Sequence, residues 1–152
     1  MKILLTSIHI VLVLSSIHCQ NQSKNGNMGK TSTVNLQQKK IEKIELTEQT
    51  RGSRKIVTFT PTTKTASFNE EVSNSKISTS EWESIASKAA ALDLSKISTY
   101  EAPTTGRYSD RAMTATLVIT SNGTTYTSAS FDSGHPPKEL EALYKEISKK
   151  NP

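Results

Sequence analysis

The pattern of apolar and polar positions along this chain changes several times, and each change predicts an element. Apolar and polar residues partly alternate over 41–47, where Ile44 and Leu46 share one face, and residues 55–60 are β-branched and aromatic. Arg51-Gly52-Ser53 between these two segments is a turn signal. The pattern therefore predicts a first β-hairpin, after which a threonine-rich connection follows.

A helical period begins near residue 80. Ser80 and Glu83 have the spacing of a capping box, in which the serine hydroxyl accepts a backbone N–H and the glutamate reaches back to the cap. The apolar residues of this segment share one stripe at helical spacing. They are Trp82, Ile85, Ala89 and Leu92. We expect a helix to about Leu92 that packs this stripe against the core.

The clearest local signal is Asn122-Gly123, which lies between two further strand-like segments, 112–120 and 124–131. Both residues tolerate positive φ, as a type I′ turn requires. Pairing across this turn places Ile119 opposite Tyr126 and Leu117 opposite Ser128. One face of the hairpin is then apolar and the other mostly hydroxyl-bearing. The apolar face consists of Met113, Ala115, Leu117 and Ile119.

A second helix closes the chain. Pro136-Pro137 suits a helix start, and Lys149-Lys150 suits a helix end. The stripe between them is Leu140, Leu143, Tyr144 and Ile147. The order is thus ββα-ββα, and we expect an α+β fold in which two helices pack on one face of a four-stranded antiparallel sheet.

The N-terminal part has a different composition. Met1-Lys2 precedes an apolar run that ends at Ile17, which is too short to span a membrane and has the form of a secretory signal. Residues 20–40 are polar or basic and lack the apolar groups needed to fold. We therefore expect a signal peptide at 1–18, a disordered tether at 19–40 and one domain at 41–152. The expected location is the cell envelope, and a soluble secreted or periplasmic protein is the alternative.

Charge and composition narrow the function. The net charge is +5, but residues 41–152 contain 14 basic and 14 acidic residues, so the domain lacks the electrostatic footprint of a nucleic-acid binder. After signal cleavage the only histidine is His135, and no nucleophile or phosphate-binding motif accompanies it. We expect no metal, no cofactor and no enzymatic activity. Carboxylate pairs such as Glu70 with Glu71, or Asp110 with Asp132, leave only carboxylate-based chemistry open.

The long connection at 102–111 is the candidate recognition segment. It contains Arg107, Tyr108, Asp110 and Arg111, and arginine and tyrosine are enriched at binding hot spots. A purely structural interpretation instead pairs Asp110 with Arg107 or Arg111 and places Tyr108 over a sheet edge. The residues leave the oligomeric state open.

Two parts of the chain resemble known families. Leu14-Ser15-Ser16-Ile17-His18 before Cys19 resembles the lipobox of Bacteroidota-type bacterial lipoproteins, although the family usually has a small residue where His18 stands. The resemblance implies acylation of Cys19, for example by palmitate, and membrane attachment through the lipid.

The C-terminal third is similar to emfourin-like domains, which include inhibitors of thermolysin-type metalloproteases. The similarity rests on the hairpin at 120–126, on Phe131-Asp132 and on the helix with Pro136, Pro137, Leu140 and Leu143. We therefore expect a lipid-anchored envelope protein whose small domain binds a protein partner, and a proteinaceous protease inhibitor is the alternative.

Overall fold

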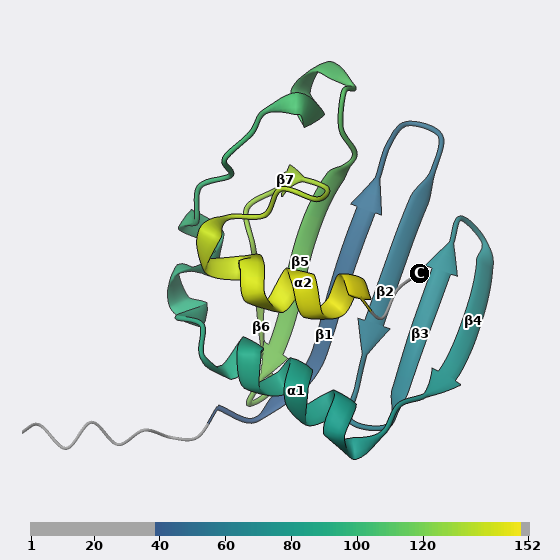
Figure 1. Cartoon of the computed structure of the whole chain (residues 1–152), viewed down its shortest axis with the longest axis vertical. Helices are drawn as coiled ribbons and strands as arrows, with labels where there is room; N and C mark the ends of the chain where they lie inside the picture. Colours follow the sequence, from purple (N-terminus) through teal and green to yellow (C-terminus); the bar gives the residue numbers. More distant parts are fainter. Residues whose placement is uncertain (1–38, 150–152) are drawn as a thin grey trace, which may run out of the picture. The chain divides into compact units, whose positions relative to one another are not determined.

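The structure is a computed structural model that describes residues 39–149. These residues form an α+β fold, as the sequence predicts, in which helices lie on one face of an antiparallel sheet (Figure 1). The predicted signal peptide, Cys19 and nearly all of the predicted tether lie outside the described residues. Among residues 39–149, no helix is long and apolar enough to cross a membrane.

The sheet has the strand order β4-β3-β2-β1-β5-β6, and β7 also pairs with β5. Three short 3₁₀ helices lie in the connections around the two α-helices. The strands are β1 (Ile41–Gln49), β2 (Arg54–Phe59), β3 (Thr63–Phe68), β4 (Glu71–Lys76), β5 (Thr114–Ser121), β6 (Thr124–Thr127) and β7 (Phe131–Asp132). The helices are α1 (Thr79–Ala90) and α2 (Glu141–Lys149), with 3₁₀ helices η1 (Leu94–Thr99), η2 (Gly106–Ser109) and η3 (Lys138–Leu140).

The prediction of four strands in ββα-ββα order is wrong, because the threonine-rich connection forms a second hairpin, β3–β4. Neither strand contains a buried residue, and all of β4 is exposed. The hairpin therefore shows no apolar alternation from which strands are predicted. Backbone pairing with β2 and a turn at Asn69, whose φ is 53°, hold it in the sheet.

The hairpin around Asn122-Gly123 is confirmed in its turn and register. Asn122 and Gly123 have φ values of 50° and 75°, and Ile119 pairs with Tyr126. The second strand is shorter than expected and resumes as β7 on the same edge of β5, where Phe131 pairs with Ala115. One extra residue therefore lies between β6 and β7, as in a β-bulge.

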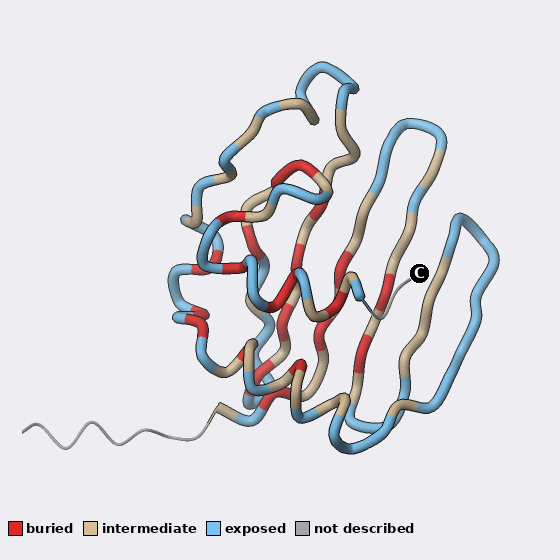
Figure 2. Tube along the Cα trace, in the orientation of Figure 1, coloured by how far each residue is buried: buried red, intermediate tan, exposed pale blue. Residues whose placement is uncertain are grey.

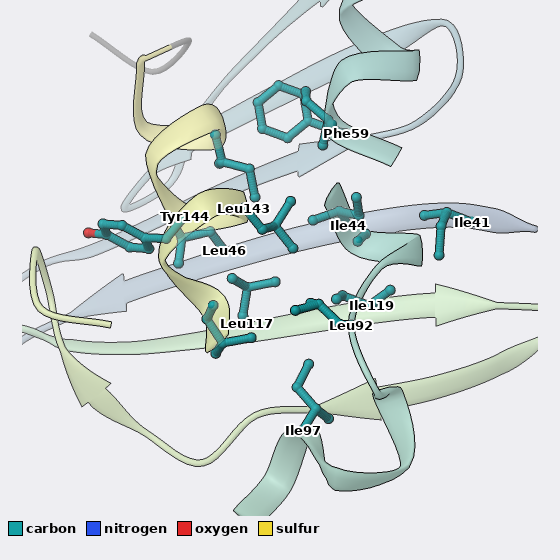
Figure 3. Packing of buried hydrophobic residues seen from close by; sticks show 14 of the residues in the cluster. Ile41, Ile44, Leu46, Phe59, Leu92, Ile97, Leu117, Ile119, Leu143 and Tyr144 are labelled. Carbon is teal, nitrogen blue, oxygen red and sulfur yellow. The ribbon is translucent and has the colours of Figure 1, made fainter. Parts of the chain in front are cut away.

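Buried residues gather on the sheet face that the helices cover (Figure 2). Leu143 and Tyr144 of α2 lie over Leu46 and Leu117 of the central strands (Figure 3). The predicted apolar stripes of both helices therefore do face the core. Other fully buried members are Ile44, Phe59, Ile85, Ala89, Ala115, Ile119, Phe131, Leu140 and Ile147.

Helix α1 begins two residues earlier than the sequence predicts. The cap is Ser78 rather than Ser80: the Glu81 N–H donates to Ser78 Oγ (3.3 Å), and the Ser78 N–H donates to Glu81 Oε2 (2.9 Å). Two capping boxes overlap in this sequence, and the earlier one places Ile77 and Trp82 at the positions of a hydrophobic staple. Both residues pack against the core, which favours the earlier start.

The cap assignment predicts different effects for two neighbouring serines. Ser78→Ala should lower the free energy of unfolding by about 1 kcal/mol because the Glu81 N–H at the helix start loses its acceptor, Ser78 Oγ. Ser80→Ala should change it by less than about 0.5 kcal/mol, since Ser80 lies inside the first turn and is exposed. Urea denaturation of both variants measures the difference, and equal losses would contradict the assignment.

Candidate functional site

The predicted recognition segment, 102–111, is fastened to the sheet by a buried ion pair. The Arg107 guanidinium donates from Nη1 to Asp132 Oδ1 at 3.1 Å, and the two side chains are 8% and 3% exposed. Asp132 lies on the short strand β7, beside the end of β5. The loop is therefore held at the end of the sheet by a charge pair that is largely shielded from water.

Backbone donors complete the environment of Asp132. The Gly106 N–H donates to Oδ2 (2.6 Å) and the Arg107 N–H donates to Oδ1 (2.9 Å). A Cβ on Gly106 would lie 3.0 Å from Asp132 Oδ2 and 3.2 Å from the Ala112 Cβ. A side chain at this position would crowd the carboxylate, so the close approach of the loop favours glycine.

These donors decide the protonation state of Asp132. Burial by itself raises the pKa of the carboxyl, but the hydrogen bonds from the backbone and guanidinium of Arg107 and from the Gly106 N–H outweigh it. The pKa is therefore held well below its usual value of 3.8. Asp132 remains an anion that anchors the loop, and it is poorly suited to accept a proton in catalysis.

The other predicted site residues lie at the surface of the loop. Tyr108 is 75% exposed, and its ring centroid lies 4.2 Å from the Arg107 Cζ. Asp110, with φ of 55°, forms an ion pair with Arg51 of the β1–β2 turn at 3.4 Å. Arg111 Nε donates to Ser109 Oγ. The expected pairing of Asp110 with Arg107 or Arg111 is thus replaced by a pairing with a different loop.

A cleft of about 440 Å³ lies between the β1–β2 turn and this loop. Arg51 and Asp110 both line it, and their ion pair joins its two sides. Arg107 also lines the cleft. Its side chain is largely buried, whereas those of Arg51 and Asp110 are exposed. The remaining lining residues are Gln49, Thr50, Gly52, Ala112 and Thr114. The cleft brings together three charged side chains from two separate loops and has the dimensions of a small binding site.

A second polar cluster joins β1 to α2. The Tyr144 hydroxyl donates to Glu48 Oε1 (2.7 Å) and accepts from the Gly134 N–H (2.8 Å), and the Ser133 hydroxyl also donates to Glu48. Burial and the nearby Glu48 carboxylate raise the pKa of the Tyr144 hydroxyl, although the Ser133 and Gly134 donors oppose them. Tyr144 therefore keeps its proton, and the cluster serves to position the turn before α2.

His135 lies beside this cluster but does not join it. Its backbone N–H donates to the Asp132 carbonyl, and its ring Nδ1 lies 3.4 Å from the Ser133 carbonyl oxygen. The ring is exposed and contacts neither Glu48 nor the Ser133 hydroxyl through any hydrogen bond in the described residues. Residues 39–149 also contain no group of three or more histidine, cysteine, aspartate or glutamate side chains placed for a metal ion.

Sequence reasoning selected the loop but missed its partners. The sequence indicates only a turn role for Arg51 and, for Asp132, only a carboxylate pair with Asp110. Each aspartate instead has its own arginine. Glu70 and Glu71 lie exposed at the β3–β4 turn. No local pattern could reveal these contacts, since Arg107 and Asp132 are 25 residues apart, and Arg51 lies in the β1–β2 turn whereas Asp110 lies in the connection before β5.

Comparison of the chain with protein-family models, curated proteins and solved structures returned no significant match. The lipoprotein and emfourin-like resemblances therefore remain predictions from the sequence.

Proposed function

We propose that this protein is a lipid-anchored component of the cell envelope, and that its domain is a non-enzymatic binding module whose site is the cleft. The observation that carries this proposal is the position of the cleft in the fold. Strand β1 starts at Ile41, at the end where the chain enters the domain, and its last residue, Gln49, lines the cleft (Figure 1). Nine residues of extended chain span about 30 Å. The cleft therefore lies at the end of the sheet remote from the entry point.

The entry point is itself fastened to the domain. The Lys39 ammonium donates to the carbonyl oxygens of Ala90 and Leu92 at the C-terminal end of α1. Cations are favourable at this end of a helix. A domain attached through the preceding residues would thus present the cleft away from its attachment.

The construction of the cleft supports recognition. One wall is the loop whose Gly106 and Arg107 N–H groups donate to Asp132, and loops that are pre-organised in this way lose less entropy on binding. Tyr108, which follows the lining residue Arg107 in the chain, is exposed, and its ring packs against the Arg107 guanidinium. An aromatic ring stacked on an arginine is the kind of pair found at the centre of protein interfaces.

Site-specific photo-cross-linking in the cell of origin tests this proposal. With p-benzoylphenylalanine in place of Gln49, at the cleft, we expect a discrete cross-linked species. With the same residue in place of Glu83, which is exposed on α1, we expect none. Equal cross-linking from both positions, or none from the cleft, would overturn the assignment of the site.

The anchor is tested in the same strain. Metabolic labelling with a fatty-acid analogue should label the protein, and Cys19→Ser should abolish both the label and membrane attachment. A label that persists in this variant would refute acylation at Cys19. Because the cleft and the anchor are separate, this result bears on location alone.

A further inference from the structure

We propose that the cleft binds an acidic peptide segment through its carboxylate, and that Asp110 occupies the position of this carboxylate in the free protein. The inference rests on the proposed function of the cleft and adds its ligand class. It is carried by the difference between two arginine–aspartate pairs whose arginines both line the cleft. We call the Arg51–Asp110 pair the latch.

The latch is placed so that it can open. It joins the β1–β2 turn to the loop at 102–111, with 3.4 Å between Arg51 Nη2 and Asp110 Oδ2. The two side chains are 89% and 68% exposed, so water competes for both. Exposed ion pairs contribute little to stability and are readily exchanged. An incoming carboxylate can therefore replace Asp110 on Arg51 without disturbing the fold.

The other pair cannot exchange in this way. Asp132 is buried and receives two backbone N–H groups besides the guanidinium. Arg107 is thus a fixed part of the cleft lining, and Asp132 already compensates its charge. Its Nε–H has no acceptor within residues 39–149, but this atom is buried, so it offers no accessible donor to a ligand. Arg51 is consequently the arginine that a ligand can recruit.

The chemistry of the lining favours a carboxylate. A guanidinium presents a planar fork of N–H donors that matches the two oxygens of a carboxylate. Once Asp110 leaves Arg51, the free guanidinium gives that side of the cleft a positive charge. Gln49, Thr50 and Thr114 add neutral donors, and about 440 Å³ accommodates a few residues of a peptide rather than a folded surface.

The two members of the latch should therefore have opposite effects on binding. Arg51→Gln removes the recruited guanidinium and should weaken binding about tenfold, since charged hydrogen bonds are lost. Asp110→Asn removes the internal competitor and should strengthen binding by about two- to fivefold. If the pair only stabilised the two loops, both substitutions would weaken binding alike.

The measurement is an NMR titration of the full-length protein with acetyl-Gly-Ser-Glu-Glu-Ser-Gly-amide. We expect saturable shifts at residues 49–52 and 107–112. The same peptide with glutamine in place of both glutamates should not bind. The glutamine peptide with a free C-terminal carboxylate in place of the amide then tests whether a terminal carboxylate is recognised instead of a side-chain carboxylate. Arg54→Gln, which removes an exposed arginine outside the cleft, should leave the affinity unchanged.

Two results would overturn the inference: equal binding of the glutamate and glutamine peptides, or effects of the same sign from Arg51→Gln and Asp110→Asn. Absence of any peptide binding, combined with cross-linking from residue 49, would show that the cleft recognises another chemical class. In that case the inference fails and the proposed function stands. Absence of both would refute the two together.

Discussion

Asp132→Asn is expected to lower Tm by roughly 10 °C or more, because removal of one member of a buried ion pair leaves the other charge uncompensated. Arg107 would remain buried without its counter-ion, and the Gly106 and Arg107 N–H groups would face a weaker acceptor. The loop at 102–111 should detach first. Circular dichroism measures Tm, and limited trypsin digestion at Arg107 and Arg111 reports on the loop.

The matched control is Asp93→Asn. Asp93 also pairs with a basic residue, Lys96, but both side chains are largely exposed. A surface pair of this kind contributes little, so Tm should fall by no more than about 3 °C. Similar decreases in Tm for the two variants would show that the Arg107–Asp132 pair does not hold the loop at 102–111 in place.

Asp132→Asn should also change how the stability of the protein depends on pH in acid. The pKa of Asp132 is lower in the folded protein than its usual value of 3.8, so its contribution to stability is fully present above that value. The contribution is lost progressively as the pH falls below about 4 towards the lowered pKa of the folded state. Asp132→Asn should therefore lose less stability than the native protein over this acid range. Parallel acid-unfolding curves for the two proteins would contradict the assigned role.

Phe59→Ala is expected to reduce the free energy of unfolding by about 3–5 kcal/mol. Phe59 is fully buried in the helix-covered core at the end of β2, and its strand neighbour on β1 is Ile44 (Figure 3). Truncation removes a large apolar group from a site that the sheet and helices enclose. Urea denaturation monitored by Trp82 fluorescence and by circular dichroism gives the loss.

Phe68→Ala is the control for Phe59→Ala, because it makes the same change at an exposed phenylalanine. Phe68 lies on β3, beyond the helices, and is 54% exposed. We expect it to change stability by less than about 1 kcal/mol, since little apolar surface is removed from the core. Losses of similar size in the two variants would mean that the outer hairpin is packed more extensively than its exposure indicates.

The elements that the sequence predicts correctly are those with a strong local signal. Asn122-Gly123 requires positive φ at two adjacent positions, and the alternation in β5 specifies which face is buried. Helix α1 and helix α2 each carry an apolar stripe that packs as expected. In these segments short-range geometry and burial favour the same conformation, so pattern alone is sufficient.

The elements that the sequence did not predict lack such a signal. The β3–β4 hairpin is exposed on both faces and is held by pairing with β2, so its residues carry no apolar period. The choice of Ser78 over Ser80 depended on the packing of Ile77 and Trp82 against the core. In each case local rules allowed more than one outcome, and a distant contact selected one of them.

The amino-acid sequence by itself therefore determined the fold class, the central hairpin and the buried faces of the two helices, because these follow from backbone geometry and apolar period. It also pointed to the loop at 102–111 as a candidate site. Only the tertiary structure decided which residues the loop contacts, since sheet register brings Asp132 under Arg107 and Arg51 across from Asp110. Such pairings depend on the relative placement of distant segments, for which no local pattern of residues carries the information.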